Sequence, residues 1–390
     1  MMAISPIAAR LHGAGKTSLI GRYTRQGLWL ALLLGIVFFV LIQFFGGRFF
    51  AFVGIDQAFI GMATGYVEAI VFGAPAIYMF LAFRFTTEGI GKTRPIMYTS
   101  LLALICNVFL NYVFMFGHFG VPAMGAVGCG VASAITMWIL MIVLGSYVYL
   151  HHHYKPLEIF ARFAPVRLPV LKEIVSLGLP ISVTISAEAG LFSAVSILVG
   201  TRGPAITAAH QIALNFASTM FMIPLAFSAA TTIRIGHALG AGRPLDARSA
   251  GVTGILICGI FMTVSALVLI VFRDAIVAIY TKDPTVQTVA ISMLMMAAVF
   301  QIADGVQIGA AGALRGFKDT RVPMVINVFS FWVLAFPISY LAAVTYRAPP
   351  AYIWLGFVIG LTVAACLLTL RYMKVSRVAV HTTNAELPAE

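Results

Sequence analysis

Ten long apolar stretches constrain this chain more than any other feature of its sequence. Each can cross a hydrocarbon layer of about 30 Å as an α-helix, which takes about 20 residues. A transmembrane β-barrel would alternate apolar and polar residues over about 10 positions, and the sequence has no such pattern. We therefore predict an all-α integral membrane protein, with spans near 27–46, 62–83, 97–117, 127–150, 172–200, 204–232, 251–272, 286–313, 324–345 and 351–371.

The composition agrees with this class and excludes others. Of the 390 residues, 61% are hydrophobic and 10% are charged, whereas a soluble domain carries roughly 25% charged residues. This composition excludes a soluble enzyme and a disordered chain. It also excludes a nucleic-acid-binding protein, because the net charge is +12 but the Lys and Arg residues form no basic block that could follow phosphates. None of the four cysteines has the CxxC spacing of a metal or redox site.

The Lys and Arg residues predict the orientation, because they favour the cytoplasmic loops of membrane proteins. Five of them fall in the loops of one side: Arg48, Arg202, Arg273, Lys282 and Arg347. The other 20 fall on the opposite side, which carries both ends of the chain. We therefore expect both termini in the cytoplasm, and we expect the polar segment 380–390 to be a disordered cytoplasmic tail.

An internal repeat appears at an offset of 227 residues. Gly13-Ala14-Gly15-Lys16 aligns with Gly240-Ala241-Gly242-Arg243, and further pairs at the same offset are Gly27 with Gly254, Gly89 with Gly316, Thr93 with Thr320, Arg94 with Arg321 and Met97 with Met324. Parallel repeats of this kind are typical of secondary transporters. They predict two pseudo-symmetric helical lobes.

The two copies differ in what precedes the Gly-Ala-Gly loop. Two full spans precede it in the second copy, but only residues 1–9 precede it in the first. We expect 1–164 to form an N-terminal lobe with four full spans and a stub, and 165–379 to form a six-span lobe. The first copy would then lack about 60 residues, its first helix and most of its second, relative to a twelve-span protein.

Two acidic residues lie deep inside apolar spans, where a charge costs roughly 2.5–3.5 kcal/mol. Glu188 is in the middle of 172–200, and Asp304 is inside 286–313. Neither has a basic residue three or four positions away that could neutralise it. Such carboxylates either bind a cation or proton in a polar cavity, or are held neutral by a single interhelical hydrogen bond.

Other polar residues in the spans are weaker candidates for a cavity. Glu68 is within about two turns of the outer membrane face, so that it could instead reach the interface. The remaining candidates are His210, Gln211, Asn215, Gln301 and Asn107, each of which lines a cavity or bonds a neighbouring helix. The run His151–His153, between a span and a basic loop, is interpreted as a solvated interfacial segment rather than a metal site.

Three motifs carry a resemblance to a known family: MGAVGCGVAS (124–133), AAHQIALNFAS (208–218) and GALRGFKDTRVP (312–323). Together they resemble the multidrug and toxic compound extrusion family, in its NorM-like bacterial branch. The resemblance implies twelve helices in two lobes around a central cavity, in a multi-pass protein of the bacterial inner membrane. It also implies alternating access, in which cationic, amphipathic drugs are exported in exchange for Na⁺ or H⁺.

The resemblance also implies roles for particular residues. Glu188 and Asp304 match the acidic residues of the family's seventh and tenth helices that are implicated in cation coupling. The NorM-like site often has a tyrosine four residues before the second acid, where this chain has Phe300. Because Phe300 has no hydroxyl ligand, the choice between Na⁺ and H⁺ stays open.

Two other function classes compete with the exporter. A flippase for a lipid-linked saccharide shares the two-lobe plan in the wider superfamily, but its cavity tends to be basic, whereas the charges within these spans are acidic. A membrane-embedded enzyme would need a clustered catalytic set, and the sequence has none. The expected protein is thus a monomeric transporter without an organic cofactor, with cationic small molecules as substrates, lipid around it and no nucleic acid partner.

Overall fold

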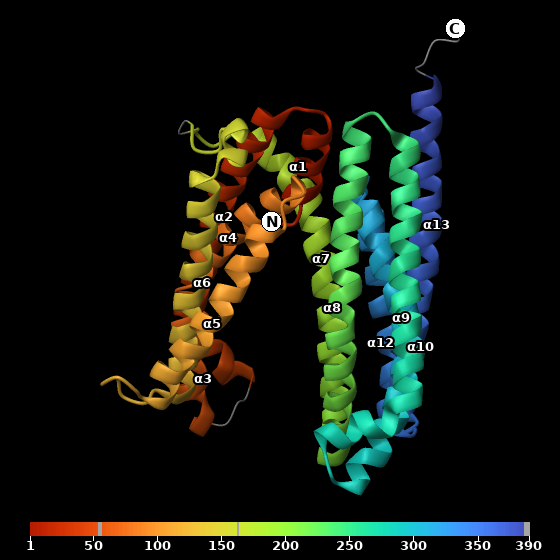
Figure 1. Cartoon of the computed structure of the whole chain (residues 1–390). Helices are drawn as coiled ribbons and strands as arrows, with labels where there is room; N and C mark the ends of the chain where they lie inside the picture. The colour runs from red at the N-terminus through yellow and green to blue at the C-terminus, as the bar shows by residue number, and fades with distance from the viewer. Residues whose placement is uncertain (54–56, 162–163, 386–390) are drawn as a thin grey trace. The chain divides into compact units, whose positions relative to one another are not determined.

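The computed structural model describes all residues except 54–56, 162–163 and 386–390. The described residues form helices joined by turns and short loops, with no β-strand among them (Figure 1). Within the described part of the chain, nine helices are long and apolar enough to cross a membrane, and a tenth span follows if one bent pair is counted as a single span. The predicted all-α membrane class is confirmed.

The chain divides into two compact units, Met1–Val175 and Ser176–Glu390, here called the N-terminal and C-terminal units. The N-terminal unit contains α1 (Ile4–Gly13), α2 (Thr17–Val53), α3 (Gln57–Val71), α4 (Ala74–Gly89), α5 (Arg94–Phe116), α6 (Gly125–Leu150) and the 3₁₀ helix η1 (His152–Leu157). Helix α7 (Leu168–Gly200) begins in this unit and continues into the next.

The C-terminal unit continues with α8 (Pro204–Gly240), α9 (Pro244–Tyr280), α10 (Pro284–Gly316) and α11 (Arg321–Val328). The π-helices η2 (Phe329–Ala335) and η3 (Leu341–Thr345) flank α12 (Phe336–Tyr340), and the 3₁₀ helix η4 (Pro350–Trp354) precedes α13 (Leu355–Ala385). Helices α8, α9 and α13 pack around α10. The spans Pro284–Gly316 and Pro350–His381 are the two most buried of the candidate spans.

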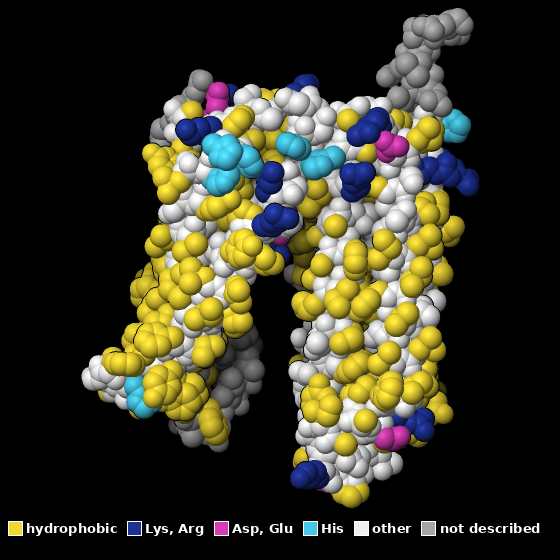
Figure 2. Space-filling model, in the orientation of Figure 1, with side chains coloured by type: hydrophobic (Ala, Val, Ile, Leu, Met, Phe, Trp, Pro, Cys, Tyr) yellow, Lys and Arg dark blue, Asp and Glu magenta, His cyan; other side chains and the backbone are white. Residues whose placement is uncertain are grey.

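The surface of each unit fits a membrane environment. Hydrophobic side chains cover much of the visible length of the helices, and most Lys and Arg side chains lie toward helix ends (Figure 2). Large apolar residues such as Leu33, Phe44, Leu104 and Val271 are more than half exposed. An exposed apolar surface of this extent is stable against lipid rather than water.

The span expected at 62–83 is broken. Helices α3 and α4 meet at an angle of 46° across Phe72 and Gly73. Pro75 occupies the first turn of α4, where its missing N–H leaves no hydrogen bond unmade and its ring suits a helix start. Gly35 of α2 lies against this break, because an added Cβ there would come within 2.4 Å of the Pro75 Cα atom.

Other local details also differ from simple straight spans. Pro180 and Pro224 lie inside α7 and α8, each of which continues as one α-helix through its proline. Helix α9 has non-helical backbone angles at Phe272, which has no proline beside it. At the end of the chain, α13 continues to Ala385, so that residues 380–385 are helical, and the rest of the expected tail lies outside the described residues.

The helix boundaries follow the sequence offset of 227. Helix α2 covers 17–53 and α9 covers 244–280, while α3 and α4 together cover 57–89 and α10 covers 284–316. Helix α1 ends at Gly13 and α8 at Gly240, and α5 and α11 begin at Arg94 and Arg321. Every one of these boundaries differs by 227 residues, as the repeat requires.

The same offset relates close packing contacts in the two units. A Cβ on Gly27 would meet Ile4, and one on Gly254 would meet Thr231, which is the residue equivalent to Ile4. Gly89 likewise packs against Ala8 and the Ser5 carbonyl, and Gly316 packs against Ile235 and the Thr232 carbonyl. Glycine allows these helix backbones to approach closely, which is common between membrane helices.

Candidate cation site

The candidate site is built on α10, whose Asp304 is only 5% exposed. The Oδ1 atom of Asp304 is buried and has no hydrogen-bond partner among the described residues. An ionised carboxylate oxygen without a partner in a buried position is costly. Asp304 is thus suited to take up a cation or a proton.

Glu188 of α7 lies near Asp304, as an aromatic cluster on one side of both residues shows. The ring of Phe192 stacks on Phe357 at 4.6 Å, and Phe300 lies 6.1 Å from the same Phe357 ring. Glu188 is one turn before Phe192, and Asp304 is one turn after Phe300. Because α7 and α10 run in opposite directions (Figure 1), both acids lie on the same side of the cluster.

Arg315 supplies a positive charge near the two acids. Its Nε atom donates to the Ala311 carbonyl at 3.2 Å, and its terminal nitrogen donates to Ser228 Oγ at 3.2 Å. Side chains of a helix lean toward its N-terminus, so that Arg315 on α10 and Glu188 on the antiparallel α7 reach toward each other. The charge of Glu188 interacts with those of Arg315 and Asp304.

The expectation that Glu188 has no neutralising base nearby is therefore incomplete. Within α7, no basic residue lies one turn from Glu188. The positive charge near Glu188 comes from another helix. Arg315 comes from the end of α10, two residues beyond the predicted span 286–313. Ser228 fixes the guanidinium there, since its hydroxyl also donates to the Ile308 carbonyl at 2.7 Å and ties α8 to α10.

Further amide side chains lie on the turns of α10 around Asp304. Gln301 is fully buried, and its Oε1 atom accepts a hydrogen bond from Ser265 at 2.9 Å, while its Nε2 atom has no partner among the described residues. Gln307 is 1% exposed, and both of its side-chain polar atoms lack a partner in the described structure. Three consecutive turns of α10 thus carry buried polar atoms that the fold itself does not satisfy.

Phe300 and His210 have packing roles in this unit. Phe300 is 1% exposed and lies 5.4 Å from the Trp354 ring. His210 is fully buried: Trp354 Nε1 donates to its Nδ1 at 3.1 Å, and its Nε2 lies 3.0 Å from Ser196 Oγ. Because both ring nitrogens of His210 have partners, its side chain joins α7, α8 and η4 and is not available to a ligand.

The remaining candidates lie on α8, α3 and α5. Gln211 and Asn215 are exposed on α8, and the Asn215 Oδ1 atom accepts a hydrogen bond from Tyr280 at 2.8 Å. In the N-terminal unit, Asn107 donates to Thr136 at 3.2 Å, and Glu68 is half-buried on α3.

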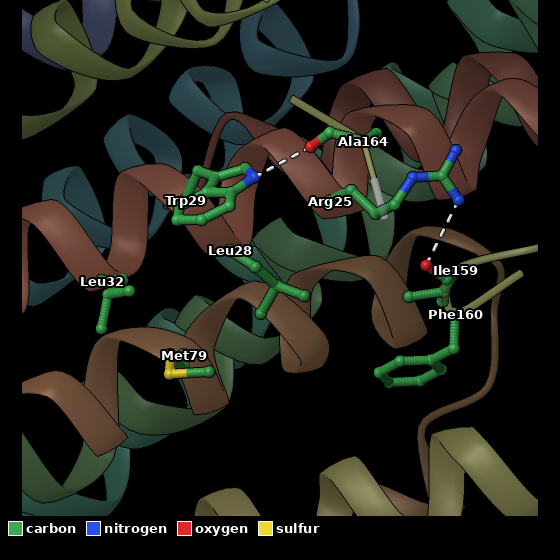
Figure 3. Close-up of a pocket in the computed structure, with 8 residues that line it drawn as sticks. All are labelled: Arg25, Leu28, Trp29, Leu32, Met79, Ile159, Phe160 and Ala164. Atoms are coloured by element: carbon green, nitrogen blue, oxygen red, sulfur yellow. Dashed lines mark hydrogen bonds between the residues drawn. The ribbon is translucent and has the colours of Figure 1, made fainter. Parts of the chain in front are cut away.

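A separate hollow of about 400 Å³ lies in the N-terminal unit between α2, α4 and the segment after η1. Figure 3 shows Arg25 and Trp29 of α2 bonded to this segment, through the carbonyls of Ile159 at 3.2 Å and Ala164 at 3.1 Å. These bonds hold the segment against α2. None of the candidate site residues lines this hollow.

A buried and a half-buried acid inside the spans, a repeat and helices with exposed apolar faces define a polytopic membrane transporter. A sequence model described as MatE matches residues 1–113 and 180–341, which is more than half of the chain. The chain belongs to the MatE family, and its resemblance to multidrug and toxic compound extrusion proteins is confirmed at the level of the family. It is a membrane transporter of the multidrug-efflux type and not an enzyme.

Solved structures show the same fold at low sequence identity. The eukaryotic MATE transporter AtDTX14 is 20% identical with a TM-score of 0.85, over 98% of this chain and 85% of that one. An outward-facing multidrug resistance MATE family transporter of the MOP superfamily is 20% identical with a TM-score of 0.86, over 97% of this chain and 84% of that one. A MOP superfamily transporter from Pyrococcus furiosus is 20% identical with a TM-score of 0.86, over 97% of this chain and 83% of that one. Its binding pocket is described as having reverse polarity.

Sequence reasoning missed Arg315 and Gln307 as members of this polar region. The predicted span 286–313 ends before Arg315, although Arg315 stands within the apolar motif GALRG, where the small neighbours Gly312 and Ala313 predict close helix packing. Gln307 is three residues after Asp304 and so lies on nearly the same face of a helix. The spacing of three residues from Gln301 to Asp304 to Gln307 is a signal that could have found it.

Proposed function

We propose that the protein is a cation-coupled exporter of cationic, amphipathic small molecules, with Glu188 and Asp304 as the coupling acids. The observation that carries this proposal is the buried, unpartnered carboxylate oxygen of Asp304 beside a second acid within the spans. A cation or proton that binds there removes the cost of the buried charge. It therefore stabilises one state of the transporter relative to another.

The charges of the site support a single monovalent coupling ion. With Glu188, Asp304 and Arg315 all ionised, these three side chains have a net charge of −1. One Na⁺ or one H⁺ neutralises this charge. The oxygen atoms of the two carboxylates are ligands that suit Na⁺, and each carboxylate also accepts a proton, so that the residues fit both ions.

The proposed orientation follows from the distribution of Lys and Arg, and it places both termini in the cytoplasm of a bacterium whose inner membrane contains the protein. Alternating access in such a transporter exposes the site to one side and then to the other. Exchange of the ion for the drug then requires that the two compete for the same state. We propose that the protein works as a monomer.

A flippase for a lipid-linked saccharide is the second candidate. It would need basic side chains that face a pyrophosphate group. Among the described residues of the C-terminal unit, Arg315 is the one basic side chain that reaches the acids. Its charge interacts with that of Glu188, and it donates a hydrogen bond to Ser228. The excess of acidic over basic groups favours cationic substrates.

Efflux of ethidium tests the proposal. The probe is loaded into cells that lack their own exporters, and its loss is followed by fluorescence with and without a Na⁺ gradient and with a protonophore. The proposal expects efflux that stops when one of the two ion gradients is removed. Efflux that ignores both gradients, or transport of a lipid-linked saccharide instead of ethidium, contradicts it.

A further inference from the structure

Three consecutive histidines follow α6, and their ligand atoms converge. The available nitrogen atoms of His151, His152 and His153 all lie within 4.8 Å of one another. His151 is half-buried, whereas His152 and His153 are exposed. The sequence alone favours a solvated interfacial run, but it does not show that the three rings point to one place.

Backbone geometry explains why neighbouring side chains converge. Helix α6 ends at Leu150, and His151 has the extended angles φ −80° and ψ 130° before η1 begins at His152. The His153 N–H donates back to His151 Nδ1 at 3.4 Å, which closes a tight turn around the His151 ring. This turn brings residues that would point apart in a regular helix or strand to one side.

Ring contacts restrict the three side chains further. His151 stacks on Tyr147 of α6 at 4.8 Å and on His152 at 4.5 Å. The rings of His152 and His153 meet edge to face at 4.1 Å. Because these contacts already limit the rotamers, less side-chain entropy is lost when the three rings are fixed by a common ligand.

The nitrogen atoms are in a suitable state to bind a metal ion. His151 Nδ1 is occupied by the His153 N–H, which leaves its Nε2 as the ligand atom. His152 and His153 are exposed, so that a metal ion can reach their ring nitrogens from the solvent. A metal ion requires the neutral imidazole.

We propose that His151, His152 and His153 form a binding site for a divalent transition metal ion that prefers imidazole ligands, with Zn²⁺ as the representative ion. Three imidazoles and one water complete a tetrahedral zinc site. At a Zn–N distance of 2.0–2.1 Å, the ligand nitrogens are about 3.3 Å apart. Small rotations about the side-chain bonds bring the nitrogens from their present separation to this distance.

The surroundings of the site predict its selectivity and strength. The set of three nitrogen ligands does not suit Mg²⁺ or Na⁺, which prefer oxygen. This site is therefore independent of the coupling ion at Glu188 and Asp304. Lys92, between α4 and α5, places a positive charge near His153 and weakens metal binding, and we expect micromolar rather than nanomolar affinity.

Calorimetric titration with ZnCl₂ tests the proposal on the whole protein, purified in detergent without a histidine tag. We expect one saturable Zn²⁺ ion per chain and no heat of binding with MgCl₂. The double variant H152A/H153A should bind at least tenfold more weakly. The matched control is H118A, because His118 is a single histidine that stacks on Tyr112 at 3.9 Å in the loop between α5 and α6.

A second variant separates a metal site from weak, unspecific binding. K92Q removes the nearby positive charge without touching a ligand, and it should strengthen Zn²⁺ binding a few-fold. Thermal unfolding of each variant in the absence of zinc shows whether it folds like the wild type. The proposal is overturned if no saturable Zn²⁺ ion binds, or if H152A/H153A and H118A bind zinc equally well.

Discussion

Helix α10 and its repeat counterpart, the pair α3 and α4, have the same length and different chemistry. Both cover 33 residues at the offset of 227, and both end in a glycine that packs closely against a preceding helix. Helix α10 is continuous and carries Gln301, Asp304 and Gln307. The residues of α4 at the equivalent positions are Ala74, Ile77 and Phe80, after a bend of 46°.

This difference shows which part of the repeat is architecture and which part is function. The glycine contacts recur in both units because helix packing imposes the same steric demand on each. Among the described residues of the two counterparts, buried carboxylate and amide atoms without a partner occur on α10 alone, whereas the α3–α4 pair has only the Thr64 and Thr87 hydroxyls in that state. Packing does not require the carboxylate and amide groups, and burial makes them costly. We infer that coupling is assigned to the C-terminal unit, and the following predictions test that asymmetry.

The largest effect is expected when the coupling acids are neutralised. E188Q and D304N keep the size of the side chain but remove the charge that attracts a cation. Each should reduce ethidium efflux to the background level while the amount of protein in the membrane stays unchanged. The matched control is E68Q, which neutralises the acid of the broken counterpart and should retain most of the efflux. Normal efflux by both E188Q and D304N refutes the assignment.

The next effect concerns Arg315, which sets the net charge of the site. R315Q changes the net charge of the three side chains from −1 to −2, so that a cation should bind about tenfold more tightly, which corresponds to about 1.4 kcal/mol. Release of the ion should then slow transport. R315K keeps the charge and should bind the coupling ion nearly as the wild type does. Equal ion affinities of R315Q and the wild type would show that Arg315 does not set the charge of the site.

The packing that both units share predicts similar losses of stability. An added Cβ would come within 2.6 Å of Ala8 at Gly89 and within 2.7 Å of Ile235 at Gly316. Overpacking of this kind typically costs about 1–3 kcal/mol. G89A and G316A should both lower the thermal unfolding temperature in detergent, whereas G61A, with nothing within 4 Å, should not lower it. A loss in only one unit would contradict equivalent packing.

A small effect is expected at Phe300. F300Y adds a hydroxyl one turn before Asp304, and this hydroxyl should increase the Na⁺ dependence of efflux a few-fold if Na⁺ is the coupling ion. The wild-type Phe300 is packed against Trp354, so that the added hydroxyl also costs some stability. An unchanged Na⁺ dependence, together with loss of efflux under a protonophore, would identify H⁺ as the ion.

Much of the fold follows from the sequence because its signals are local or periodic. Apolar length predicts the spans, and the offset of 227 predicts where counterpart helices begin and end. The bend before Ala74 and the π-helices after Val328 depend on which neighbours replace lost backbone hydrogen bonds, and a single sequence does not supply those neighbours.

The candidate site was predictable in part for the same reason. Asp304 and Glu188 are conspicuous because a carboxylate in an apolar span is expensive wherever the chain folds. Arg315 was not predictable in this way, since its role depends on the antiparallel packing of α7 and α10 and on the Ser228 hydroxyl of α8. For His210 the sequence leaves two roles open, a cavity residue or a bond to neighbouring helices, and only the structure shows that Trp354 and Ser196 contact its two ring nitrogens.

Gradient-driven transport in liposomes tests the central claim most directly. Purified wild-type protein and D304N are reconstituted side by side, and ethidium movement is recorded after an inward Na⁺ gradient or an inward H⁺ gradient is imposed. We predict that one of these gradients drives transport by the wild type and that neither drives transport by D304N. Transport by D304N at the wild-type rate under the same gradient would contradict the claim that Asp304 couples the ion to the drug.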